Sequence, residues 1–170
     1  ELLEKLASEA FMPLSYGGGI NNIEQIKKIF SLGFEKVIIG TEFFKNSSFI
    51  NKASEIFGSQ SIIVSVDYKK NDIVYINSGT TKTNKKLLDY VIECQRNGAG
   101  EILLQCIEND GKFKGYDLKT ISFISRICSV PLIASCGAKT INDMKKALLS
   151  GANAVSAGSF FVYNGPHKAV

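Results

Sequence analysis

The sequence predicts an α/β fold: a (βα)8 TIM barrel built from two similar half-barrels, with residues 1–170 forming one partial barrel domain. Apolar segments of strand length alternate with segments of helical periodicity, which is typical of parallel strands joined by crossover helices. An internal repeat relates two segments that lie 118 residues apart. Glycine and hydroxyl residues follow several of the expected strands, where barrel enzymes have their active sites.

Six strands are expected where short apolar segments occur. They span residues 12–15, 36–39, 61–66, 101–106, 131–135 and 154–157. Helices are expected between them because apolar residues recur there at intervals of three or four, at 23–30, 50–57, 87–92, 121–127 and 143–149. Thr140 is the expected N-cap of the last of these, another helix opens the chain, and alternating residues predict a short hairpin at 72–77.

The internal repeat predicts a duplicated architecture. A shift of 118 residues gives ten identities in 31 aligned positions. The identities include Pro13 with Pro131, Gly19 with Gly137, Ile23 with Ile141, Gly33 with Gly151 and Gly40 with Gly158. This period is close to half of a barrel of about 250 residues. The expected strands are therefore strands three to eight, with strands one and two expected upstream of Glu1 and the last helix after Val170.

Composition excludes several classes of protein. Hydrophobic residues make up 45% of the chain, which is typical of a globular domain, and no apolar run approaches the roughly 18 residues that span a bilayer. No signal peptide is visible, so a cytoplasmic protein without membrane contact is expected. The net charge of +4 suits an anionic small ligand and does not predict nucleic-acid binding. The four cysteines lie far apart with only His167 to accompany them, so neither a metal nor a cofactor is expected.

Two related phosphate sites are predicted at the strand ends. One combines Gly19 with Thr41, and its counterpart in the repeat combines Gly137 with Gly158 and Ser159. Glycine lets a backbone N–H approach an anion without a side chain in the way, and the hydroxyls add donors. Two anion sites at one barrel mouth suit a substrate with a phosphate at each end. The alternative is that these glycines serve only the tight turns.

Asp67 is the expected acid–base residue, because it ends an apolar strand in a partly desolvated mouth that should raise its pKa. The alternatives are a helix N-cap or a loop salt bridge with Lys69. Asp110 serves either a phosphate loop or a turn cap. Lys36 and Glu101 open two strands at the opposite end of the barrel, where they form either a polar ring or ordinary surface charges.

Several motifs then resemble the HisF family, the cyclase subunits of imidazole glycerol phosphate synthase. They are residues 13–20 (PLSYGGGI), 57–67 (FGSQSIIVSVD), 98–104 (GAGEILL), 115–117 (GYD) and 131–137 (PLIASCG). The resemblance implies a HisA/HisF-type barrel that takes ammonia from a HisH-like glutaminase partner. It implies a reaction in histidine biosynthesis that converts a bis-phosphorylated ribonucleotide into imidazole glycerol phosphate and AICAR.

The resemblance also implies roles for single residues. Asp67 matches a catalytic aspartate, while Lys36 and Glu101 match members of the charged gate through which ammonia enters. Glu35 stands beside this gate, where the family meets its glutaminase. Seven residues match phosphate-site positions: Gly19, Thr41, Asp110, Gly111, Gly137, Gly158 and Ser159.

Some positions depart from the family pattern. The second catalytic aspartate belongs to strand one, outside the 170 residues, and departures occur at Gly40, Gln105, Glu108, Asn109 and Cys136. Residues 161–170, with Ser15-Tyr16, resemble the WbuZ branch, whose members serve amidino-sugar biosynthesis for surface polysaccharides. A WbuZ-like paralogue and a non-catalytic ammonia-channelling barrel therefore stay open as alternatives. A HisA-type isomerase is disfavoured, because Lys36 with Glu101 favours an ammonia user.

Overall fold

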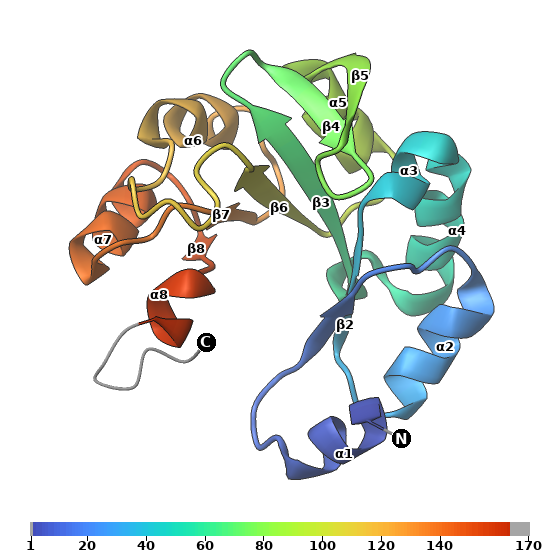
Figure 1. Ribbon diagram of the computed structural model, residues 1–170. Coiled ribbons are helices and arrows are strands. Elements are labelled where there is room, and N and C mark those ends of the chain that lie inside the picture. The colour runs from blue at the N-terminus through green and yellow to red at the C-terminus, as the bar shows by residue number, and fades with distance from the viewer. Residues whose placement is uncertain (1, 164–170) are drawn as a thin grey trace.

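A curled sheet of six parallel strands, with helices covering its convex side, forms the centre of the computed structural model, which describes residues 2–163 (Figure 1). The strand order is β1-β2-β3-β6-β7-β8, and every pairing along it is parallel. These strands are β1 (Ser15–Gly17), β2 (Lys36–Ile39), β3 (Ile62–Lys69), β6 (Glu101–Cys106), β7 (Leu132–Ser135) and β8 (Ala154–Val155). The predicted partial (βα)8 barrel is thereby confirmed.

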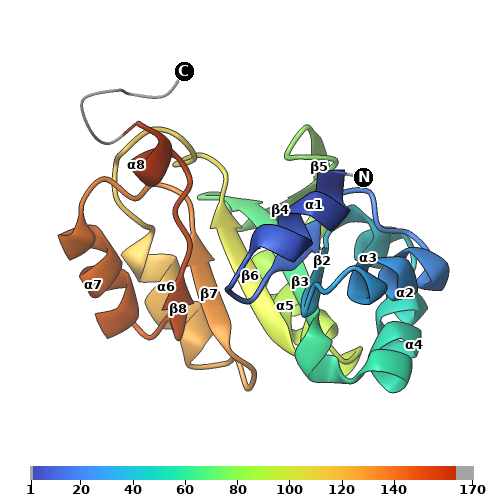
Figure 2. The ribbon, with the colours of Figure 1, turned by 90° about the horizontal axis from the view of Figure 1, so that it is seen from below.

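Helices connect the strands and cover the outside of the sheet. They are α1 (Leu2–Glu9), α2 (Ile23–Ser31), α3 (Thr41–Lys45), α4 (Ser47–Phe57), the 3-10 turn η1 (Ser59–Ser61), α5 (Leu87–Arg96), α6 (Leu118–Ser125), α7 (Ile141–Leu149) and α8 (Ser159–Val162). Viewed from below, β1 with α1 and β8 with α8 face each other across the open side of the sheet (Figure 2). In the described residues, β1 and β8 each have a strand partner on one side only.

Side chains alternate between the two faces of the sheet, and the two faces differ in burial. On β3, Ile62, Val64 and Val66 face the helices and are fully buried, whereas Ser65 and Asp67 face the concave side and are half-buried. The same alternation runs along β2 and β6. Burying the convex face supplies the hydrophobic driving force. The concave face keeps some contact with solvent, so polar side chains such as Ser65 and Asp67 can lie there.

The internal repeat is present in the structure, most closely in two helices, their N-caps and the glycine turns before them. Helices α2 and α7 each have nine residues and begin 118 residues apart. Their N-caps, Asn22 and Thr140, each accept a hydrogen bond from a backbone N–H three residues on, which satisfies a free donor of the first turn. Gly19 and Gly137 both have positive φ, at 72° and 96°. The duplicated sequence therefore folds into duplicated turns as well as duplicated elements.

Four strand predictions were wrong at their ends. The segment 131–135 begins one residue before β7, the segment 154–157 ends two residues after β8, and the other two differ more. The segment 12–15 begins too early, because Pro13 has no N–H to donate and pairing starts only at Ser15. The segment 61–66 ends too soon, because residues 67–69 pair antiparallel with β4 (Ile73–Ile76), so Asp67 lies within β3 and does not end it. The segment 72–77, expected to be a hairpin, forms a single strand, β4, which pairs antiparallel with β3 and with β5 (Thr81–Lys86).

Cys94, Cys106 and Cys136 are buried free thiols, and Cys128 is a half-buried one. No helix of the described residues has the length and apolar character needed to cross a membrane. Residues 164–170, which carry most of the WbuZ-like tail as well as His167, lie outside the described residues.

We predict that the 170-residue polypeptide, expressed by itself, aggregates or forms a molten state. The outer edges of β1 and β8 leave backbone groups available for pairing with other chains. Large apolar side chains are also exposed near β8, with Ile141 at 74%, Leu149 at 77% and Phe161 at 67%. Size-exclusion chromatography and near-UV circular dichroism during urea unfolding test this. A monomer with one cooperative transition would contradict it.

Candidate active site

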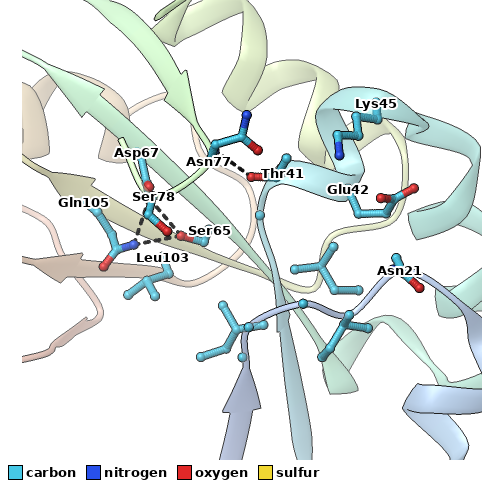
Figure 3. Close-up of a pocket in the computed structure, with 17 residues that line it drawn as sticks. Asn21, Thr41, Glu42, Lys45, Ser65, Asp67, Asn77, Ser78, Leu103 and Gln105 are labelled. Atoms are coloured by element: carbon cyan, nitrogen blue, oxygen red, sulfur yellow. Dashed lines mark hydrogen bonds between the residues drawn. The ribbon is translucent and has the colours of Figure 1, made fainter. Parts of the chain in front are cut away.

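The C-terminal ends of the strands surround a cavity of about 530 Å³ (Figure 3). Residues 17–19 and Gly40 form one part of its wall, while Asp67 and Gln105 reach it from the concave faces of β3 and β6. Gly19 and Thr41 both line this cavity, so the structure brings together the first pair of residues that the sequence predicts to bind phosphate. Space is open around Gly19, where an added Cβ would meet nothing within 4 Å, so its positive φ is what requires glycine.

The Thr41 hydroxyl, which the sequence predicts as a phosphate ligand, already takes part in a hydrogen bond within the protein. Its Oγ1 accepts a hydrogen bond of 2.8 Å from the backbone N–H of Asn77, at the tip of the β4–β5 hairpin. The hydroxyl keeps its own hydrogen to donate to a ligand. The helix that begins at Thr41 has five residues, and its counterpart α8 has four. Local N–H groups, more than a helix dipole, are therefore the donors available at both sites.

The hairpin tip is a part of the site that the sequence analysis missed. Asn77 and Ser78 line the cavity and have left-handed backbone conformations, with φ of 52° and 56°. The Asn-Ser-Gly turn at 77–79 was a local signal for the hairpin. Its position over the barrel mouth had no such signal, because the contact with Thr41 spans 36 residues of sequence.

Asp67 points toward the cavity, and one of its two carboxyl oxygens accepts hydrogen bonds from neighbouring side chains. Oδ1 accepts hydrogen bonds from Gln105 Nε2 at 2.8 Å and from Ser65 Oγ at 3.1 Å. Burial raises the pKa of this carboxyl group above its ordinary value, and the nearby Asp110 adds to the increase. Lys69, the salt-bridge partner considered from the sequence, lies over the ring of Tyr75 instead.

The second pair of strand ends forms a small cavity of about 30 Å³. All five predicted residues of this side line it: Asp110, Gly111, Gly137, Gly158 and Ser159. Its volume is close to that of a single water molecule. A phosphate group would therefore have to displace the loops around it, whereas the first cavity already has room.

Backbone contacts fix the second cavity. Gly115 donates its N–H to the carbonyl of Gly137 over 2.7 Å, and an added Cβ at Gly137 would lie 2.3 Å from the carbonyl oxygen of Gly115. Asn109 is 4% exposed and donates its Nδ2 to the same oxygen at 3.0 Å. Glycine at 137 is therefore required by close packing as well as by its positive φ. Asn109, a departure from the family pattern, joins the two ends of the loop at 107–115, and the Gly115 N–H holds this loop against the residues that follow β7.

A third cavity, of about 480 Å³, lies between the other two. It shares Asp67 and Gln105 with the first cavity and Asp110 and Cys136 with the second. Burial and the neighbouring Asp110 raise the pKa of Cys136 to about 12, so this thiol is protonated at neutral pH. The three cavities form one mouth in which Asp67 lies between the two glycine-lined ends.

Lys36 and Glu101 meet at the opposite end of the strands. Lys36 Nζ contacts Glu101 Oε1, and the two side chains are 32% and 17% exposed. They start β2 and β6, which flank β3 and are not neighbours, so the ion pair crosses the first residues of β3 on the concave side. This pair is more buried than the surface pair of Lys27 and Glu24, whose side chains are 53% and 78% exposed.

Comparison with known proteins identifies the family. The model of the family described as "Histidine biosynthesis protein" matches residues 1–168. The chain is 44% identical over 178 residues to "Putative imidazole glycerol phosphate synthase subunit HisF" of Leptospira interrogans, covering 99% of this chain and 69% of that protein. It is 41% identical over 165 residues to "Imidazole glycerol phosphate synthase subunit HisF" of Dictyoglomus turgidum, covering 95% of this chain and 66% of that protein.

A HisF subunit of Wolinella succinogenes gives a similar result, with 39% identity over 168 residues, 96% of this chain and 66% of that protein. The chain thus spans about two thirds of the length of these relatives. The likeness extends through both glycine-lined ends of the mouth and through the strand that carries Asp67. The chain belongs to the histidine biosynthesis protein family and, within it, to the HisF group.

Proposed function

We propose that the protein is a cyclase subunit of the imidazole glycerol phosphate synthase type. It uses ammonia on a bis-phosphorylated ribonucleotide and forms imidazole glycerol phosphate and AICAR. The observation that carries this proposal is the position of Asp67 between two glycine-lined cavities in a member of the HisF group. The names of the relatives support a role in histidine biosynthesis and a partner subunit.

The two ends of the mouth would hold the two phosphates. At the first end, Gly19 and Thr41 offer backbone and hydroxyl donors, and at the second end Gly111, Gly137 and Ser159 do so. Binding through both phosphates would hold the reacting carbon atoms over Asp67, and such positioning lowers the entropic part of the barrier. Asp110 belongs to the loop of the second end, where its carboxylate would accept hydrogen bonds from the substrate hydroxyls or fix the loop.

Asp67 would transfer protons during ring closure. Attack by ammonia leaves a proton to be removed from nitrogen, and the departing nitrogen must gain one. A carboxyl group can do both when its pKa lies closer to the working pH than that of an exposed aspartate. Burial in the mouth raises the pKa of Asp67 in this direction.

Ammonia would enter past Lys36 and Glu101 and travel along the concave faces of β3 and β6. Glu101 pairs with Ile63, Leu103 with Ser65 and Gln105 with Asp67 in the parallel register. Gln105 lies four positions along the strand from Glu101, a distance of about 13 Å. A HisH-like glutaminase at this end of the barrel, beside the exposed Glu35, would supply the ammonia.

A WbuZ-like function is the second candidate. Gln105 and Cys136 depart from the HisF pattern, and both line the mouth where a substrate would lie. Changed side chains at this point favour a changed substrate more than a changed source of nitrogen. A third possibility, a barrel that only channels ammonia, makes no use of Asp67, so the aspartate variant below separates it from the two catalytic functions.

We predict that Asp67→Asn in the full-length protein abolishes ammonia-dependent turnover and leaves the affinity for the phosphorylated substrate within a few-fold. Asparagine keeps the shape of the side chain but cannot exchange a proton, and loss of acid–base catalysis costs about 10²–10⁴-fold in rate. Product formation from ammonium salts and calorimetric binding measure the two effects. Asp89→Asn, on the exposed side of α5, is the matched control. Turnover that persists unchanged in Asp67→Asn would remove this residue from the mechanism.

We predict that Lys36→Ala impairs glutamine-dependent turnover with the partner subunit and leaves turnover with free ammonia nearly normal. The reason is that Lys36 lies at the end of the barrel far from the phosphate sites, where ammonia from the partner would enter. The ratio of the two rates is the measurement. Lys27→Ala, which breaks the exposed ion pair with Glu24, is the control. An ordinary surface pair is worth only about 0–1 kcal/mol. An unchanged rate ratio in Lys36→Ala would therefore leave the ammonia route without support.

A further inference from the structure

Gln105 is the nearest neighbour of the proposed acid–base residue, and it lies directly opposite Asp67 in the register between β3 and β6. Its Nε2 lies 2.8 Å from Asp67 Oδ1 and 2.8 Å from Ser65 Oγ. Ser65 Oγ in turn lies 3.1 Å from the same Asp67 oxygen. The three side chains therefore form a closed triangle on the concave face, at the boundary between the two larger cavities (Figure 3).

The triangle holds only one oxygen of the carboxyl group. Both hydrogen bonds end on Oδ1, and within residues 2–163 no hydrogen bond ends on Oδ2. The carboxyl group is thus oriented through Oδ1, while Oδ2 keeps its capacity to bind or release a proton. A substrate held between the two ends of the mouth would meet this second oxygen.

The chemistry of the two partners suits a group that changes its charge. An amide has both a donor and an acceptor, and a hydroxyl group can act as either. Nε2 donates to the carboxylate, whereas the protonated acid can donate to Ser65 Oγ or, after rotation of the amide, to Gln105 Oε1. A lysine or arginine in this position could only donate, and its charge would hold Asp67 in the ionised form.

We propose that Gln105 and Ser65 are positioning residues for Asp67, which fix its carboxyl group through Oδ1 and stabilise the carboxylate form more than the acid. This inference rests on the proposed function. Within one turnover, Oδ2 takes a proton from the attacking nitrogen as the carbon–nitrogen bond forms. It returns that proton to the departing nitrogen as the second bond breaks, so that Asp67 ends as the carboxylate it was at the start.

Other charged and titratable groups also face this carboxyl group. Asp110 of the β6–α6 loop acts on its charge, while Lys69 at the end of β3 and the Cys136 thiol after β7 line the same cavity. Glu42 and Lys45 of α3 line the wider cavity. The hydrogen bonds from Gln105 and Ser65 lower the pKa of Asp67 against the effect of burial, so their removal must raise it further.

The test, made in the full-length protein, replaces Gln105 by methionine, which has a similar length and shape but no amide. In Gln105→Met we expect the pKa of Asp67, followed by carbon-13 NMR of its carboxyl carbon in substrate-free protein, to rise by about one pH unit. The acidic limb of the pH profile of ammonia-dependent kcat/KM should move upward by the same amount. We expect Ser65→Ala to shift both in the same direction by less, and it serves as the second variant if Gln105→Met does not fold.

Gln95→Met is the matched control. Gln95 is a half-buried glutamine of α5 that receives hydrogen bonds from the backbone N–H and hydroxyl of Ser129, so its loss removes structural bonds far from Asp67. This variant should leave the pKa of Asp67 and the pH profile unchanged. An unmoved pKa of Asp67 in both Gln105→Met and Ser65→Ala overturns the inference. The NMR titration needs no substrate, so it tests the inference separately from the activity. Absence of ammonia-dependent turnover in the unmutated full-length protein would overturn the proposed function instead.

Discussion

Strand β3 pairs with β2 on one side and with β6 on the other, and these pairings determine which side chains reach the mouth. It is the central strand of the curled sheet, and its alternate residues must face the helices and the concave side in turn. Because Val64 and Val66 are buried beneath the helices, Ser65 and Asp67 have to face inward. A shift of one residue in register would exchange the two sets and remove the carboxyl group from the mouth. The same pairing aligns Asp67 with Gln105 and brings Lys36 within reach of Glu101.

The duplicated sequence produces two similar backbones with different surroundings. Turns, caps and helix starts repeat at a spacing of 118 residues, yet one end of the mouth is wide and the other is tight. At the wide end, the backbone N–H of Asn77 at the hairpin tip donates a hydrogen bond to the Thr41 hydroxyl. At the tight end, the backbones around Gly115 and Gly137 touch directly, and Asn109 secures the contact. A long substrate with two unequal ends would suit such a mouth better than a symmetric one.

Much of this arrangement could be read from local patterns. Apolar periodicity predicted the six strands and their parallel order, and the side chain at Thr140 predicted a helix start that the structure has. The glycines predicted the turns at both ends of the mouth. What the sequence could not give were contacts between distant segments. The hairpin extended β3 beyond Asp67, and the bonds from Gln105 to Asp67 and from Asn77 to Thr41 span 38 and 36 residues. Such contacts arise only when the sheet has formed, and no local spacing encodes them.

A structure of the protein with a bis-phosphorylated ribonucleotide bound tests the central claim most directly. We expect one phosphate group against the backbone of Gly19 and the Thr41 hydroxyl, and the other between Gly111, Gly137 and Ser159 after a small opening of that end. We also expect the atoms between the two phosphates to lie within hydrogen-bond reach of Asp67 Oδ2. A ligand with both phosphates at one end, or with Asp67 turned away from it, would contradict the account.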